Sequence, residues 1–165
     1  MAFQFFDGER GTIKKGEGHT VLIHTEVIIN AHPDKVWAVL TDWGKLPEWS
    51  PGLLNLTGDF CKDGNITATF KLGIGEHAQD FTHPLIYFEE GRMFGWSAPL
   101  PYMAGMTDHH IYKLEPLPEG RTRFLQTDQL TGGLEHVIGA HMARGMMQSY
   151  VEFNRALKVR VEGMA

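Results

Sequence analysis

The first strongly patterned segment, residues 19–30, alternates between apolar and polar positions. On an extended strand, one face carries the β-branched residues Val21, Ile23, Val27 and Ile29. This period of two predicts a half-buried strand. Pro33 then suits the first position of a helix, and an apolar stripe follows at Val36, Trp37 and Leu40. Residues 32–42 are therefore expected to form a short helix. The Trp- and Pro-rich stretch after them is expected to form a second short helix or turn.

The middle of the chain is a series of apolar stretches separated by turn residues. We expect six further strands here, at residues 53–60, 66–73, 79–88, 92–99, 109–116 and 122–130. The connections are short enough for hairpins, which indicates an antiparallel sheet. The facing of the strand that contains His83 is left open, because residues 85–88 are all apolar.

The C-terminal segment, residues 133–161, has a helical period instead. Its apolar stripe consists of Met142, Met146, Tyr150, Phe153, Leu157 and Val161. A lone long amphipathic helix must bury its stripe, and the sheet is the surface available to it. Residues 1–18 are Gly-rich and charged and are expected to form an N-terminal arm. Residues 19–165 are expected to form a single domain.

Composition narrows the classes of function. A chain of 165 residues can build one domain with a real core. Its net charge of −5, without a cluster of Lys and Arg, argues against nucleic acid as a partner. The start does not read as a signal peptide, and no apolar stretch is long enough to span a bilayer. We therefore expect a cytoplasmic protein, monomer or homodimer, that does not insert into membranes.

The order of these elements resembles that of the SRPBCC superfamily, which has the START/Bet v 1-like helix-grip fold. This superfamily includes the polyketide cyclase/dehydrase and lipid-transport families. The stretches that carry the resemblance are INAHPDKVWAVLTDWGKLPEWSP, YKLEPLPEGRTRF and DQLTGGL, and they cover roughly residues 20–162. The resemblance implies an α+β fold in which a seven-stranded antiparallel sheet curls around the C-terminal helix. It also implies a ligand cavity between the two.

Two adjacent histidines, His109 and His110, begin one of the strands. Neighbouring residues on a strand point to opposite faces, so the two cannot ligate one metal ion together. Lys113 and Glu115 favour the solvent side, which turns His110 inward together with Tyr112. If the hairpin turns around residues 118–119, His110 lies opposite Asp128, with Cβ atoms about 5 Å apart.

These positions suggest a polar patch in an apolar cavity. His110, Asp128 and Tyr112 are the candidate catalytic residues, as base, orienting carboxylate and oxyanion donor. The candidate ligand-binding residues are Phe70, Phe94, Trp96, Tyr112, Gln126, Met142, Met146 and Tyr150. The histidine spacing suggests no metal site, and no cofactor is expected.

Three functions remain open at this stage. The favoured one is binding of a hydrophobic or aromatic small molecule, with the polar patch as its anchor. The second is an enzyme that resembles polyketide cyclases, aromatases or dehydratases. The third is an interaction module that resembles the Hsp90-activator branch, against which the polar outward residues of the sheet argue.

Overall fold

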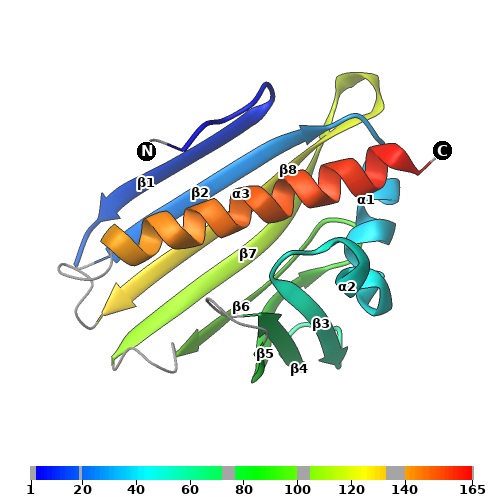
Figure 1. Cartoon of the computed structure of the whole chain (residues 1–165). Coiled ribbons are helices and arrows are strands. Elements are labelled where there is room, and N and C mark those ends of the chain that lie inside the picture. The colour runs from blue at the N-terminus through cyan, green and yellow to red at the C-terminus, as the bar shows by residue number, and fades with distance from the viewer. Residues whose placement is uncertain (1–2, 19, 72–76, 100–104, 133–139, 165) are drawn as a thin grey trace.

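The computed structural model describes residues 3–18, 20–71, 77–99, 105–132 and 140–164. It is an α+β fold in which one antiparallel sheet packs against a long C-terminal helix (Figure 1). The strands are β1 (Glu9–Gly16), β2 (Thr20–Ile29), β3 (Leu53–Gly58), β4 (Asn65–Lys71), β5 (Ala78–Glu89), β6 (Met93–Pro99), β7 (Met106–Leu117) and β8 (Arg121–Gly132). The helices are α1 (Pro33–Leu40), α2 (Leu46–Trp49) and α3 (Ala140–Gly163), with short 3-10 turns at Trp43–Lys45 and Pro118–Gly120.

In the described residues the sheet has eight strands, in the order β1-β2-β8-β7-β6-β5-β4-β3. The expected number was seven, because residues 1–18 read as an arm. Residues 9–16 instead pair with β2 along their whole length, from Glu9 opposite Val27 to Gly16 opposite Thr20. β1 is an edge strand rich in Lys and Arg, which is how natural sheets protect an open edge from further pairing. That composition explains why the strand lacks the apolar alternation of the others.

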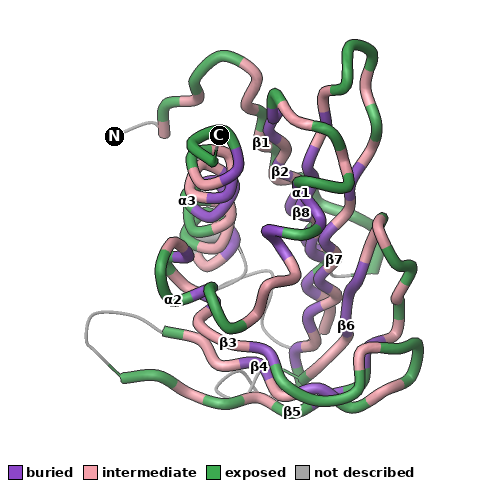
Figure 2. Tube along the Cα trace, turned by 90° about the vertical axis from the view of Figure 1, so that its right-hand side faces the viewer, coloured by how far each residue is buried: buried purple, intermediate pink, exposed green. Residues whose placement is uncertain are grey.

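The helix α3 lies across the concave face of the sheet, and the β3–β6 half curves around below it (Figure 2). Its main contacts are with β2 and β1. Phe153, Leu157 and Val161 of the predicted stripe are buried in the main core, as expected. The predicted start of the helix at residue 133 lies outside the described residues. Among the described residues, none of the helices is both long and apolar enough to cross a membrane.

The short helices form where the sequence predicts them. α1 begins at Pro33, and its buried residues are Val36, Trp37, Val39 and Leu40. His32 takes the capping position that Ser or Asp commonly occupies, and its Nδ1 accepts a hydrogen bond from the backbone N–H of Asp34 at 3.4 Å. An imidazole nitrogen thus replaces the usual side-chain oxygen as the acceptor for one of the free N–H groups of the first turn.

The hairpin of β7 and β8 fixes the register of the polar patch. The chain turns at Pro118–Gly120, with Glu119 in the left-handed region at φ 64°. From this turn, Leu114 lies opposite Phe124, Tyr112 opposite Gln126, and His110 opposite Asp128. This is the predicted register.

One glycine allows β6 to approach β7 beside the patch. A Cβ atom on Gly95 would lie 2.6 Å from the backbone oxygen of His110 and 3.1 Å from the Cα of Ile111. Both are backbone atoms, which cannot move aside without disturbing the pairing of the strands. Glycine at position 95 therefore positions the strand that carries Trp96 against the strand that carries His110.

Candidate functional site

The inner face of β7 and β8 carries a buried polar cluster, as predicted. His110 is 4% exposed, Asp128 2%, Tyr112 2% and Gln126 1%. His109 lies on the other face, where its ring meets that of Tyr87 with centroids 5.6 Å apart. The strand alternation therefore divides the two histidines as the sequence suggests.

The hydrogen bonding of His110 differs from the simplest expectation. Its Nε2 lies 3.0 Å from Oε1 of Gln126, although Asp128 is the residue directly across the strand pair. The amide of Gln126 is fixed by its other bonds, because Nε2 donates to Oδ1 of Asn154 at 2.6 Å and to the backbone oxygen of Tyr150 at 3.3 Å. Oε1 must therefore accept, so Nε2 of His110 carries the proton and Nδ1 of the neutral ring keeps its lone pair.

Asp128 has two other donors instead. The hydroxyl of Tyr150 donates to Oδ2 at 2.6 Å, and the backbone N–H of His109 donates to Oδ1 at 3.0 Å. The rings of His110 and Tyr150 lie 4.6 Å apart. Asp128, Tyr150 and His110 are thus neighbours, and α3 contributes a side chain to the site.

A second pair of buried polar residues supports this arrangement, and sequence reasoning did not assign it. Asn154 of α3 donates from Nδ2 to Oγ1 of Thr25 at 3.2 Å, and that hydroxyl donates to the backbone oxygen of Gln126 at 3.2 Å. Asn154 is 1% exposed and Thr25 is fully buried. Asn154 lies one helical turn after Tyr150, which belongs to the predicted apolar stripe. This spacing could have indicated that Asn154 faces the sheet.

Asp108 joins the cluster from the same face of β7, two residues before His110. It is 8% exposed. Burial and the nearby charge of Asp128 raise the pKa of Asp108 to about 7, against hydrogen bonds from the Trp96 indole and backbone N–H groups that lower it. Burial also lowers the pKa of His110, while Asp128 and Gln126 act in the opposite direction. The candidate ligand atoms of Asp108, His110 and Asp128 all lie within 4.8 Å of one another.

Aromatic rings surround the cluster on the inner face. His110 stacks on Tyr112 with centroids 4.4 Å apart, and Trp96 lies 5.3 Å from His110. The ring of Phe94 stacks on that of Tyr112 with centroids 4.7 Å apart, and the ring of Phe70 lies 6.2 Å from that of Trp96. Burial raises the pKa of Tyr112 well above its ordinary value, with Asp128 and Asp108 adding to the effect, so its hydroxyl stays protonated.

His83 of β5 faces the same interior, which settles the orientation that the sequence leaves open. It is 6% exposed, and its ring lies 5.0 Å from that of Trp96. Among the described residues, neither ring nitrogen has a hydrogen-bond partner, although the nearby backbone of Phe81 favours the charged form. Burial, together with the nearby His110, lowers the pKa of His83 to about 4, although the backbone of Phe81 acts in the opposite direction. His83 is therefore a neutral, buried imidazole beside the cluster.

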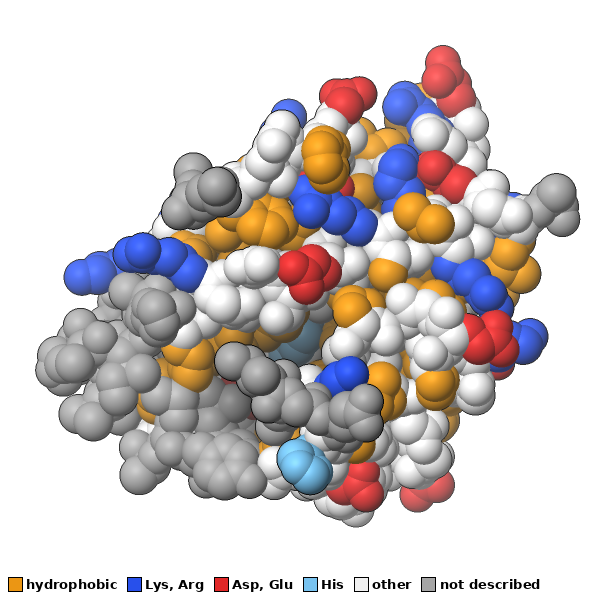
Figure 3. Space-filling model, in the orientation of Figure 1, with side chains coloured by type: hydrophobic (Ala, Val, Ile, Leu, Met, Phe, Trp, Pro, Cys, Tyr) orange, Lys and Arg blue, Asp and Glu red, His pale blue; other side chains and the backbone are white. Residues whose placement is uncertain are grey.

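The remaining predicted ligand-binding residues come from α3. Met142, Met146 and Tyr150 pack against a smaller core cluster of Val21, Ile23, Met106, Leu130 and Ala143. All three are only partly buried. In the view of Figure 3, a histidine side chain is visible below α3, deep between the helix and the strands, with apolar side chains around it.

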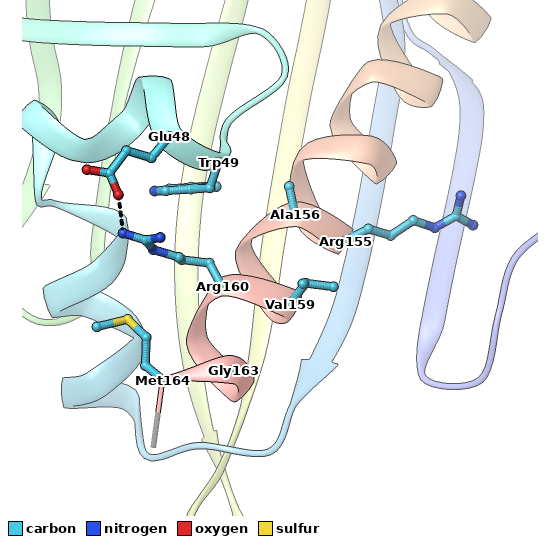
Figure 4. A pocket seen from close by; sticks show the side chains of 8 residues that line it. All are labelled: Glu48, Trp49, Arg155, Ala156, Val159, Arg160, Gly163 and Met164. Carbon is cyan, nitrogen blue, oxygen red and sulfur yellow. Dashed lines mark hydrogen bonds and ion pairs between the residues drawn. The ribbon is translucent and has the colours of Figure 1, made fainter.

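A separate cavity lies away from the polar cluster. It is an open groove of about 640 Å³ between α2 and the C-terminal half of α3, lined by Glu48, Trp49, Arg155, Ala156, Val159, Arg160, Gly163 and Met164. Figure 4 shows Arg160 reaching across to Glu48 beside the Trp49 ring. None of the predicted ligand-binding residues lines this groove.

Solved structures share the fold at low sequence identity. A protein from Rhodobacter sphaeroides is 21% identical with a TM-score of 0.68, and the match covers 93% of this chain and 100% of that one. A START superfamily protein from Mycobacterium smegmatis is 14% identical with a TM-score of 0.66, covering 87% and 99%. The aromatase/cyclase Zhui from Streptomyces sp. R1128 is 17% identical with a TM-score of 0.61, covering 87% and 94%.

No curated protein matches the chain. The family described as polyketide cyclase/dehydrase and lipid transport matches residues 20–162 of the chain. This range contains α1–α3 and seven of the eight strands, including every residue of the polar cluster. The chain belongs to the polyketide cyclase/dehydrase and lipid transport family.

Proposed function

We propose that the protein binds a hydrophobic or aromatic small molecule between the inner face of the sheet and α3. The observation that carries the proposal is the partial exposure of apolar side chains on this inner face. Phe70 and Ala98 on the sheet, and Met146 and Tyr150 on α3, retain accessible surface although they face the interior. Apolar surface that points inward but is not covered by the protein's own side chains is the property of a ligand site.

The polar cluster would orient the ligand at one end of this surface. His110, Asp108 and Asp128 are the buried polar groups there, and Tyr150 joins them through Asp128. A mostly apolar site with a few fixed polar groups gives affinity through burial and specificity through hydrogen bonds. Membership of a family whose description includes lipid transport supports the same class of ligand.

The test is a titration with Nile red, a neutral dye that fluoresces in apolar surroundings. We expect saturable binding with one dye per chain. Met146→Trp should weaken it at least tenfold, because the larger ring fills the inner face. Gln148→Trp is the matched control, since Gln148 lies on the exposed side of the same helix. Equal affinity in the two variants, or no saturable binding at all, would refute the proposal.

A second candidate function is catalysis of the cyclase or aromatase kind. The observation that favours it is a buried imidazole, unprotonated at Nδ1, that lies near two carboxyl groups. His110 would remove a proton next to a ketone, and the protonated Tyr112 would donate to the developing oxyanion. With a synthetic polyketone, His110→Gln would then reduce turnover far more than affinity. A loss of affinity alone would assign His110 to ligand anchoring.

A further inference from the structure

The buried cluster contains two carboxyl groups that no cationic side chain of the described residues pairs. Asp108 and Asp128 are 8% and 2% exposed and lie close to one another. Within the described part of the chain, neither carboxylate forms an ion pair or hydrogen bond with a lysine or arginine; their donors are neutral N–H and O–H groups. Buried carboxylates are normally paired with a cation or bound to a metal ion, because an isolated buried charge is costly.

We propose that Asp108, His110 and Asp128 form a binding site for a divalent transition-metal ion. Their candidate ligand atoms lie within 4.8 Å of one another. Ligand atoms bound to one zinc ion at about 2.0–2.2 Å are at most roughly 4.4 Å apart, so a small side-chain rotation completes the geometry. Two carboxylates neutralise the two charges of the ion. The imidazole favours zinc, copper, iron or nickel over magnesium and calcium, which prefer oxygen ligands.

The hydrogen bonding of His110 independently points to a metal. A histidine that ligates a metal through one ring nitrogen donates its other N–H to a fixed acceptor. Nε2 of His110 does so to Oε1 of Gln126, whose amide is fixed by Asn154. The Nδ1 lone pair is left for the ion. Tyr150 and the backbone of His109 hold the Asp128 carboxylate in the same way.

His83 is the second independent feature. His83 is 6% exposed, and within the described residues neither of its ring nitrogens has a hydrogen-bond partner. Its ring and that of His110 both contact Trp96, at centroid distances of 5.0 and 5.3 Å. An unpaired buried imidazole beside a three-ligand cluster is available as a fourth ligand.

From the sequence alone we expect no metal site, because that expectation rests on the spacing of the histidines and His109 faces away from His110. The site instead combines one histidine of the pair with carboxylates of two strands. Asp108 lies on the inner face with His110 because the two residues are two positions apart on β7, and side chains at that separation point to the same face of a strand. The proposal goes beyond the proposed function and does not rest on it, since metal binding is measured without any organic ligand.

The experiment measures Zn²⁺ binding by calorimetry, after treatment with a chelator. The starting protein carries His24→Gln and His32→Gln, because these partly or fully exposed histidines lie beside Glu26 and Asp34 and could bind zinc weakly. We expect one zinc ion per chain. Asp108→Asn and His110→Gln should each weaken binding by at least about tenfold, the lower limit found even for residues that only support a ligand.

Matched controls distinguish this site from general surface binding. His109→Gln changes the neighbouring histidine on the outer face, and Asp80→Asn removes an exposed carboxylate on β5. Both should bind zinc within about twofold of the starting protein. Equal affinities in the Asp108→Asn and Asp80→Asn proteins would overturn the proposal. Failure of the starting protein to bind one added zinc ion per chain would overturn it as well.

A measurement on the starting protein alone covers the case in which the variants do not fold. Co²⁺ held by four or five nitrogen and oxygen ligands absorbs visible light much more strongly than the aqueous ion. We expect such bands, their loss on addition of Zn²⁺, and no thiolate charge-transfer band. An aqueous-like spectrum, or a thiolate band from the exposed Cys61, would contradict the assignment.

Discussion

Replacing Gln126 by leucine removes the amide that connects His110 to α3. Gln126 is 1% exposed, accepts from His110 at 3.0 Å and donates to Asn154 at 2.6 Å. The substitution leaves the N–H of His110 and the side-chain oxygen of Asn154 without partners in a buried site. Each such group costs about 1–3 kcal/mol. The apolar side chain recovers part of this through burial, so we expect a loss of about 3 kcal/mol in the free energy of unfolding.

Chemical denaturation followed by tryptophan fluorescence measures the loss. Gln129→Leu is the matched control, because Gln129 is an exposed residue on the same strand. Its effect should stay within about 0.5 kcal/mol. A double-mutant cycle with His110→Phe then isolates the pair, and the double variant should lose at least about 1 kcal/mol less than the sum of the single variants. Additive losses, or equal losses for Gln126→Leu and Gln129→Leu, would refute the assigned network.

Three further substitutions test the surrounding fold. Burial alone would raise the pKa of Glu9, but Arg155 lowers it overall, so the pair stabilises the protein above about pH 4.5 and this contribution is lost as the pH falls through the folded-state pKa. Glu9→Gln should therefore cost about 2 kcal/mol at pH 7 and progressively less in acid, as measured by urea unfolding at several pH values; a pH-independent difference would contradict the pair. Gly95→Ala should lower stability by at least about 2 kcal/mol, since its Cβ would meet the backbone of β7, whereas Gly44→Ala, with nothing within 4 Å, should have little effect; equal unfolding midpoints would contradict the close approach. Glu119→Gly should stabilise the hairpin by about 1 kcal/mol because it relieves a left-handed backbone conformation, and a lower melting temperature would contradict this reasoning.

The sequence predicts most of the sheet because the core strands other than β5 have a clear inner and outer side. The position of Pro118 and Glu119 is enough to place His110 opposite Asp128, since pairing is counted outward from the turn. β1 was missed because an edge strand needs little apolar surface. Its charged residues therefore resemble those of an unstructured arm.

The internal connections of the site were harder to predict than its members. Strand alternation shows which side chains share a face, but the choice of partner depends on rotamers and on the helix that covers them. Gln126 bonds to His110 because Asn154 and the Tyr150 backbone fix its amide, and α3 has no register with β8 that the sequence could reveal. His83 was undecided because both faces of its strand are apolar nearby.

We propose above all that a hydrophobic ligand binds between the inner face of the sheet and α3, and methionine methyl groups can report that location directly. Met106, Met142 and Met146 lie at the inner face, whereas Met164 lines the outer groove between α2 and α3. The measurement is an NMR titration of protein labelled with ¹³C at the methionine methyl groups, with Nile red as the ligand. We expect saturable shifts of the Met142 and Met146 signals and an unchanged Met164 signal. A shift confined to Met164 would place the ligand in the outer groove and contradict binding between the sheet and α3.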